Sequence, residues 1–209
     1  PEAFVNMLAL LGWNPGTSQE IFSIDELIEQ FSLERVGKSG ARFDPDKARW
    51  FNQRYLQSRH PDELADAVLK QALEHGHETD HEKARKIALL LRDRVSFPTE
   101  LLMEGAFFFK APEEYDEVFV KKKLKPESPA LLEKLYQALN PLHDFSADSC
   151  QQAINDFMKS HDIGAGKLMP ALRLALVGSG TGPGLAEIME ILGREESLKR
   201  IQTAINRLR

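Results

Sequence analysis

The chain has 209 residues, 42% of them hydrophobic and 28% charged, an ordinary composition for one large folded domain or two to three small ones. Its single cysteine excludes an internal disulfide and a zinc site built on cysteines. No run of residues approaches the length of a transmembrane helix and no signal peptide opens the chain, so we expect a cytosolic protein with no membrane partner.

The net charge of −5 conceals an uneven distribution along the chain. Residues 32–60 carry seven basic and three acidic side chains, and residues 159–209 carry eight and five. Residues 1–31 and 61–158 are acidic, with net charges of −5 and −7. Two basic blocks in an acidic chain indicate either solvated faces or contacts with a polyanion.

The first 31 residues predict two helices. Apolar residues at helical spacing over residues 4–11 stop at Gly12, which predicts a left-handed cap. Because the sequence begins at Pro1, inside this helical pattern and without an initiator methionine, we expect the chain to be a fragment of a longer protein. Ser23 and Glu26 then predict a capping box. The apolar residues expected to face inward from the second helix are Ile24, Leu27, Ile28 and Phe31.

Residues 31–43 lack a helical period and are rich in glycine, so we expect a basic loop or a short hairpin. Asp44 and Pro45 predict the start of a helix in which aromatic residues alternate with arginines. That pattern is typical of a core face with a solvated back, and also of helices that face RNA.

From residue 61 onward, repeated apolar spacing predicts one helix after another. Thr79 and Glu82 form a second capping-box pattern, and the helix that follows ends near Arg92 and Arg94. Residues 112–129, with three prolines and the run KKKLK, are interpreted as a solvated linker near a domain boundary. Since no stretch alternates like a strand, the predicted fold class is all-α.

Residues 167–193 read KLMPALRLALVGSGTGPGLAEIMEILG. An apolar segment carries Arg173, breaks into a glycine-rich turn, and restarts as a helix that ends at Gly193. The turn lacks the Gly-Lys-Ser/Thr of a P-loop and does not open a dinucleotide-binding unit. Dense glycines allow the backbone to approach a phosphate or a base edge, and a plain flexible turn is the alternative.

Two constellations invite a metal hypothesis. His75, His77 and His81 lie close together in HGHETDH, but Gly76 and the capping-box pattern place the first two in a turn. Residues 161–164 read HDIG, which is similar to the metal ligands of HD-type phosphohydrolases, although no apolar run precedes them. No Ser-His-Asp arrangement or carboxylate pair stands out, so we expect no metal and no catalytic residue.

Three blocks together carry a resemblance: LALLGW at residues 8–13, QEIFSIDELIEQFSLERVGKSGARFDPDKARWFNQRYL at 19–56, and LRLALVGSGTGPGLAEIMEILG at 172–193. They resemble the C-terminal part of bacterial glutamyl-tRNA synthetases, which are class I aminoacyl-tRNA synthetases. The resemblance covers the whole chain except about residues 113–125. The HIGH motif and the KMSKS-type lysine loop are absent from this sequence, which implies a non-catalytic fragment without a cofactor; ATP and Mg²⁺ serve the full-length enzyme.

The resemblance implies an organisation in three helical parts. Residues 1–60 would be a stem-contact module, and residues 61–125 and 126–209 two α-helical anticodon-binding subdomains. The implied partner is the tRNA for glutamate, bound by a cytoplasmic monomer. The candidates for its sugar-phosphate backbone are Lys38, Arg42, Lys47 and Arg54.

The resemblance also implies how the anticodon is read. Arg173 and Leu185 match the positions that meet the third anticodon base, and Gly182 and Gly184 let the backbone approach it. Arg94, or alternatively Arg92, matches the arginine that reads the first base. An arginine suits both tasks because its planar group can donate two hydrogen bonds to the acceptors of one base. A helical protein-interaction module without catalytic activity is the alternative, favoured by the acidic middle of the chain.

Overall fold

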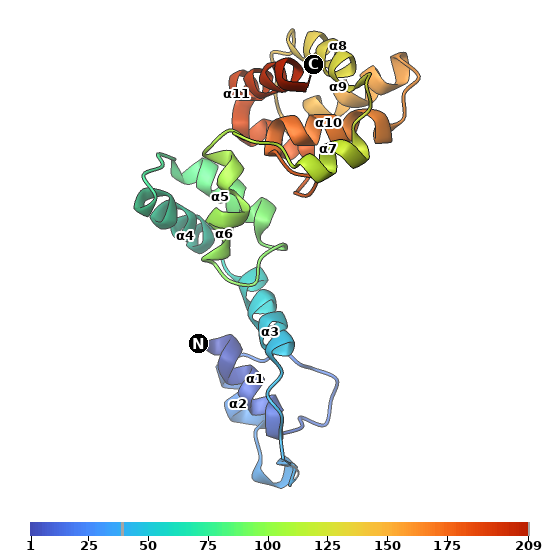
Figure 1. Ribbon diagram of the computed structural model, residues 1–209. Coiled ribbons are helices and arrows are strands. Elements are labelled where there is room, and N and C mark those ends of the chain that lie inside the picture. Colours follow the sequence, from blue (N-terminus) through green and yellow to red (C-terminus); the bar gives the residue numbers. More distant parts are fainter. Residues whose placement is uncertain (39, 209) are drawn as a thin grey trace. The chain divides into compact units, whose positions relative to one another are not determined.

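The computed structural model describes residues 1–38 and 40–208, and within them the fold is all-α, as predicted (Figure 1). Eleven α-helices and two short 3-10 helices make up the regular structure of these residues, whose single extended pairing is a bridge between Trp13 and Val36. The chain divides into two compact units, Pro1–Glu104 and Gly105–Arg209. The three functional parts with boundaries near residues 60 and 125 stay a prediction.

The first unit contains six α-helices and one 3-10 helix. They are α1 (Glu2–Gly12), α2 (Ile24–Gln30), the 3-10 helix (Leu33–Arg35), α3 (Pro45–Ser58), α4 (Pro61–Glu74), α5 (His81–Leu91) and α6 (Glu100–Glu104). α1 packs on α2 and α3, whereas α4, α5 and α6 pack on one another (Figure 1). Residues 31–38 and 40–43 contain the 3-10 helix and no strand, so for these described residues the loop prediction is confirmed and the hairpin alternative is wrong.

Local signals set several helix ends as predicted. The Ser23 hydroxyl accepts a hydrogen bond from the Glu26 amide (3.1 Å), and the Glu26 carboxylate accepts one from the Ser23 amide (2.7 Å). These two bonds complete the capping box of α2. The Asp44 carboxylate accepts from the Asp46 amide (2.9 Å) where α3 begins.

Two other helix ends differ from the prediction. Asp80, not Thr79, caps α5, since its carboxylate accepts from the Lys83 amide at 2.7 Å. Gly12 is the last helical residue of α1 and is not left-handed. Trp13 ends α1 in an extended conformation because it pairs with Val36, so the helix needs no glycine cap.

Most of the apolar side chains expected to face inward from α2 lie at the surface of the first unit. Leu27 alone is buried. Ile24, Ile28 and Phe31 are exposed, Ile28 to 74%. A helical period predicts which side chains share a face, but of these four only Leu27 is buried in the apolar cluster with Trp13 and Phe22. Phe31 contacts the same cluster from the surface, with its ring centroid 5.7 Å from that of Trp13.

A buried asparagine ties three segments of the first unit together. Asn6 of α1 is fully buried, and its side-chain oxygen accepts hydrogen bonds from the Phe22 amide (2.9 Å) and the Tyr55 hydroxyl (2.9 Å). Because Phe22 precedes α2 and Tyr55 belongs to α3, one acceptor joins α1 to both. Removing it leaves a buried amide without its partner.

We expect Asn6→Ala to lower the free energy of unfolding of the first unit by about 1–3 kcal/mol, the usual effect of leaving a buried donor unsatisfied. Both tryptophans, Trp13 and Trp50, lie in this unit, so tryptophan fluorescence during urea unfolding reports on it. Asn155→Ala, at an exposed position of α9 (Ala147–Ser160) in the second unit, is the control. An unchanged urea midpoint in Asn6→Ala would contradict this account of the core.

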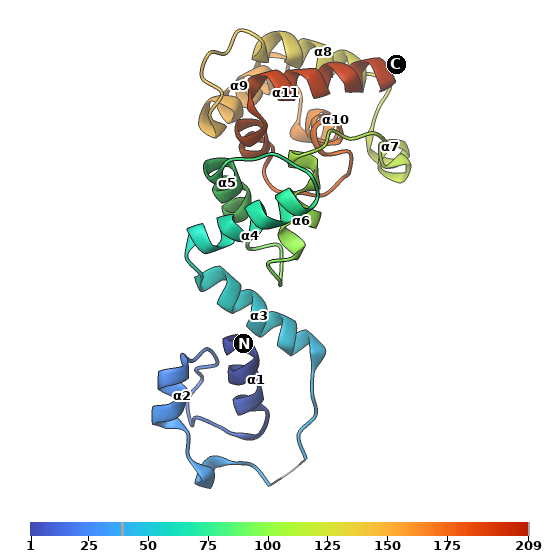
Figure 2. The ribbon, with the colours of Figure 1, turned by 90° about the vertical axis from the view of Figure 1, so that its left-hand side faces the viewer.

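The second unit contains five α-helices and one 3-10 helix. They are the 3-10 helix (Ala106–Phe108), α7 (Glu117–Lys123), α8 (Ser128–Leu139), α9 (Ala147–Ser160), α10 (Ala165–Val177) and α11 (Leu185–Leu208). α11 packs on α8, α9 and α10 (Figure 2). It is two helices broken at Gly193, where φ is +77° and ψ is 168°, as the sequence predicts.

The interpretation of residues 112–129 as a linker is wrong, because this stretch is folded into the second unit. Its centre forms α7, which Asp116 caps by accepting from the Phe119 amide (2.9 Å). The Asp116 amide donates to the Gly178 carbonyl (3.0 Å), which joins this stretch to the glycine-rich turn. Prolines and lysines indicate only the local conformational preference of a segment. The position of this segment is set by its hydrogen bond to Gly178, about sixty residues further along the chain.

A buried arginine connects three segments of the second unit. The Arg200 side chain in α11 is only 3% exposed. Its Nη1 donates to the carbonyls of Phe107 (2.7 Å) and Leu176 (2.8 Å), and its Nε lies 2.7 Å from the Glu196 carboxylate. The buried charge is therefore paired and hydrogen-bonded, as a buried charge requires.

Candidate nucleic-acid interface

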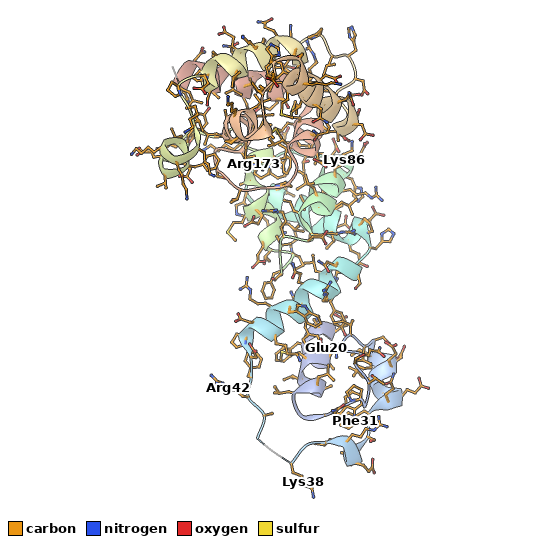
Figure 3. All side chains as sticks on the ribbon, turned by 90° about the vertical axis from the view of Figure 1, so that its right-hand side faces the viewer. Glu20, Phe31, Lys38, Arg42, Lys86 and Arg173 are labelled. Carbon is orange, nitrogen blue, oxygen red and sulfur yellow. The ribbon has the colours of Figure 1, made fainter. Side chains whose placement is uncertain are left out.

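Arg173 lies in α10, the helix that precedes the glycine-rich turn (Figure 3). The Nη1 of this half-buried side chain donates to the Pro183 carbonyl at 2.9 Å, across the turn. A guanidinium carries five N–H donors in one plane, so anchoring one nitrogen restricts the directions in which the other donors can point. The site thus has a cation whose orientation is restricted by the turn.

Both glycines that were predicted to line the site lie against the ends of charged side chains. A Cβ at Gly182, where φ is +151°, would lie 2.9 Å from Arg173 Nη1, and a Cβ at Gly184 would lie 2.0 Å from the Glu187 carboxylate. A side chain at either position would displace the charged end of a flexible neighbouring side chain, and at Gly182 the positive φ also favours glycine. The expectation that these two residues let the backbone approach a base stays a prediction.

Leu185 begins α11 directly after the turn and is 3% exposed. Its side chain therefore has little free surface for a ligand in this conformation. Its predicted contact with the third anticodon base therefore requires the turn to move, and stays a prediction.

A hollow opens beside Arg173. Its walls come from α7, from the first turns of α10 and from the glycine-rich turn. They are formed by Phe119, Lys123, Ala165, Gly166, Met169, Pro170, Arg173 and Gly180. Sequence reasoning missed Phe119 and Lys123, because the lysine run was interpreted as part of a linker. The one available signal was their spacing of four, which places them on one face of a helix.

The two candidates for reading the first anticodon base follow α5 in the first unit. Arg92 is the C-cap residue of α5, is half-buried, and its Nε lies 4.0 Å from the Asp93 carboxylate. Arg94 is exposed, and within the described residues its guanidinium has no ion pair. Arg94 is the more available of the two. The structure places Arg94 and Arg173 in different units.

The four candidates for phosphate contact are all exposed in the first unit. Lys38 and Arg42 project from the loop before α3 (Figure 3). In α3, Lys47 pairs with Glu20 at 3.0 Å, and Arg54 lies 5.4 Å from the Trp50 ring centroid. Surface ion pairs of this kind are weak, so a phosphate can replace the carboxylate.

We expect Lys47→Met to weaken RNA binding two- to fivefold at moderate salt, whatever the RNA sequence. Loss of one phosphate contact should make the slope of log K against log salt about 0.9 less steep, which titrations at four salt concentrations would measure. Glu20→Gln, which frees Lys47 from its partner, is the control and should not weaken binding. An unchanged slope in Lys47→Met would exclude a phosphate contact at this position.

The histidines and the aspartate that suggested a metal site do not form a cluster of ligands among the described residues. His161 is the C-cap residue of α9, and its Nδ1 lies 3.0 Å from the Phe157 carbonyl. In residues 1–38 and 40–208, no group of three or more His, Cys, Asp or Glu side chains is placed to hold a metal ion. None of the helices described has the length and apolar character needed to cross a membrane.

Comparisons with known proteins match the whole chain. The model of the anticodon binding domain family matches residues 63–205. The glutamate–tRNA ligase of Parabacteroides distasonis is 44% identical to this chain over 209 residues. The glutamate–tRNA ligase of Cytophaga hutchinsonii is 43% identical to it over 206 residues. A crystal structure of a glutamate–tRNA ligase from Elizabethkingia meningosepticum in complex with its amino acid covers all of the chain, with a TM-score of 0.94 and 42% identity. The chain spans 40–41% of the length of these relatives.

Proposed function

Because this chain belongs to the anticodon-binding domain family, we propose that it is the tRNA-recognition part of a glutamate–tRNA ligase. The similarity to glutamate–tRNA ligases along the whole chain carries this proposal. In the full-length protein, ATP and Mg²⁺ would support the attachment of glutamate to its tRNA. This chain supplies no catalytic residue to that reaction; its contribution is to bind and discriminate the tRNA, as a cytoplasmic monomer.

Each part of the chain has its own task in this proposal. Residues 1–60 form the stem-contact module, whose exposed cations bind the sugar-phosphate backbone at the bend of the tRNA. Residues 61–125 hold Arg94, with Arg92 as the alternative, for the first anticodon base. Residues 126–209 hold Arg173 and Leu185 for the third. Phosphate contacts provide affinity without sequence information, whereas base contacts provide the discrimination.

The anchored guanidinium of Arg173 supports the chemistry of base reading. Since the bond to the Pro183 carbonyl restricts the orientation of the group, its remaining donors suit some base edges better than others. A base with its acceptors elsewhere leaves these donors unpaired on binding, which is unfavourable. An oriented arginine is therefore a better discriminator than a mobile lysine at the same place.

The proposal is tested by titrating the chain with transcripts of the glutamate tRNA and with three variants, each altered at one anticodon base. We expect the unaltered transcript to bind most tightly and each alteration to weaken binding by about 1–3 kcal/mol. Equal affinity for all four transcripts would overturn the anticodon-reading role. Light scattering of the same samples measures the stoichiometry of the complex.

A further inference from the structure

The position of α7 is set by the glycine-rich turn. The Asp116 amide donates to the Gly178 carbonyl at 3.0 Å, and the Phe119 ring lies directly on Gly180. A Cβ added at Gly180 would lie 2.2 Å from Phe119 Cδ2, which is closer than any side chain tolerates. The absence of a side chain at residue 180 therefore brings an aromatic ring to the turn that carries Arg173.

The two outer residues of the hollow beside Arg173 come from the same face of α7. Phe119 and Lys123 are four residues apart, and both line the hollow. Phe119 is half-buried and Lys123 is exposed, and within the described residues Lys123 has no ion-pair partner. On another face, Lys121 pairs with Glu117 at 3.2 Å and Val118 is 74% exposed.

The chemistry of the hollow fits one nucleotide. Phe119 offers a ring edge or face, Met169 a polarizable thioether, and Arg173 and Lys123 two positive charges, with no carboxylate among the lining residues. Unstacked bases bind to aromatic side chains, and lysines bind the adjoining phosphates as point charges. A purely apolar ligand would make no use of the two positive charges.

We propose that α7 is part of the tRNA-binding site, with Phe119 stacking on the anticodon nucleotide held at Arg173 and Lys123 contacting its phosphate. This inference rests on the proposed function. It adds an aromatic and a basic contact from residues 113–125, the stretch where the sequence departs from the glutamyl-tRNA synthetase pattern.

The test compares substitutions on the two faces of α7, using the 209-residue chain and a fluorescently labelled tRNA anticodon stem-loop in an anisotropy titration. Phe119→Leu should weaken binding about tenfold, the usual scale for the loss of one base–aromatic stack, and Phe119→Tyr should restore it. Lys123→Met should weaken binding and make the salt slope about 0.7–0.9 less steep. Val118→Ala and Lys121→Met are the matched controls and should leave both quantities close to those of the parent chain.

Gly180→Ala provides an independent check, since the added methyl group has to displace the Phe119 ring. It should weaken binding as much as Phe119→Leu does. In the Phe119→Ala background, where the ring is gone, it should cause little further loss.

The outcomes separate this inference from the function on which it rests. If the parent chain does not discriminate between anticodons, the proposed function fails. If it does discriminate but Phe119→Leu and Lys123→Met bind like the parent, the inference about α7 is wrong and the function stands. Losses of equal size in Val118→Ala and Phe119→Leu would indicate a loosened helix, and would likewise overturn the stacking contact.

Discussion

Replacing Arg200 by methionine is expected to lower the free energy of unfolding of the second unit by about 2–5 kcal/mol. The substitution removes hydrogen bonds to the carbonyls of Phe107 and Leu176 and leaves both without this donor. Each carbonyl left unpaired in the interior is unfavourable by about 1–3 kcal/mol. Methionine fills much of the vacated volume, so most of the expected loss is polar.

Cys150 offers a direct measurement of this effect. It is the single cysteine of the chain, it is fully buried in the second unit, and burial raises the pKa of its thiol to about 12. At neutral pH the folded protein therefore presents almost no thiolate, and a thiol reagent reacts only after the unit opens. In Arg200→Met the urea concentration at which labelling begins should fall.

Two controls keep this result specific. Lys199→Met changes an exposed cation one residue away and should not alter the labelling profile. Tryptophan fluorescence reports on the first unit only, so its transition should be the same in Arg200→Met and in the parent chain. A labelling profile unchanged by Arg200→Met would show that the carbonyls find other partners.

Replacing Arg173 is expected to remove discrimination at one anticodon base. Arg173→Met should weaken binding of the unaltered glutamate tRNA by about 1–3 kcal/mol, or roughly 5- to 150-fold, the range for a base contact through two hydrogen bonds. It should hardly change the affinity for a transcript that already carries the wrong third base. The two affinities should converge in the variant, as titration of both transcripts would reveal.

Arg173→Lys separates charge from geometry. A lysine keeps the positive charge but loses the planar donors and the anchored orientation that the Pro183 carbonyl provides. We expect it to retain the salt dependence of the parent chain while losing most of the discrimination. If Arg173→Met instead weakens binding of every transcript equally, Arg173 acts as a phosphate contact or as a support for the turn.

The predictable part of the fold is the part encoded locally. Ser23 with Glu26, Asp44 with Pro45, and Gly193 each act within a few residues, so the sequence identifies these helix ends. Exposure was less predictable. The apolar spacing around Ile28 correctly implied a helix, but the surface against which a stripe packs is decided by segments elsewhere in the chain.

The candidate site shows the same division. Arg173 and its glycines are candidates because a charge in an apolar segment lies beside a glycine-rich turn that resembles one in a known family. No such signal marks Arg200, although it lies in a helix that was predicted correctly. Phe119 was missed for a physical reason: its place at Gly180 follows from a contact between segments that are distant in sequence. Local patterns predicted the elements, but they did not predict which elements meet.

The bonds of Arg200 also bear on the order of events during synthesis. The Phe107 carbonyl leaves the ribosome well before its donor, and at about 5–20 residues per second the delay is on the order of 5–20 s. During that interval the apolar faces of α8 and α10 have no α11 to cover them. The first unit can fold as it emerges, whereas the second must wait for its last helix, and this wait is when chaperones would be of most use to the nascent chain.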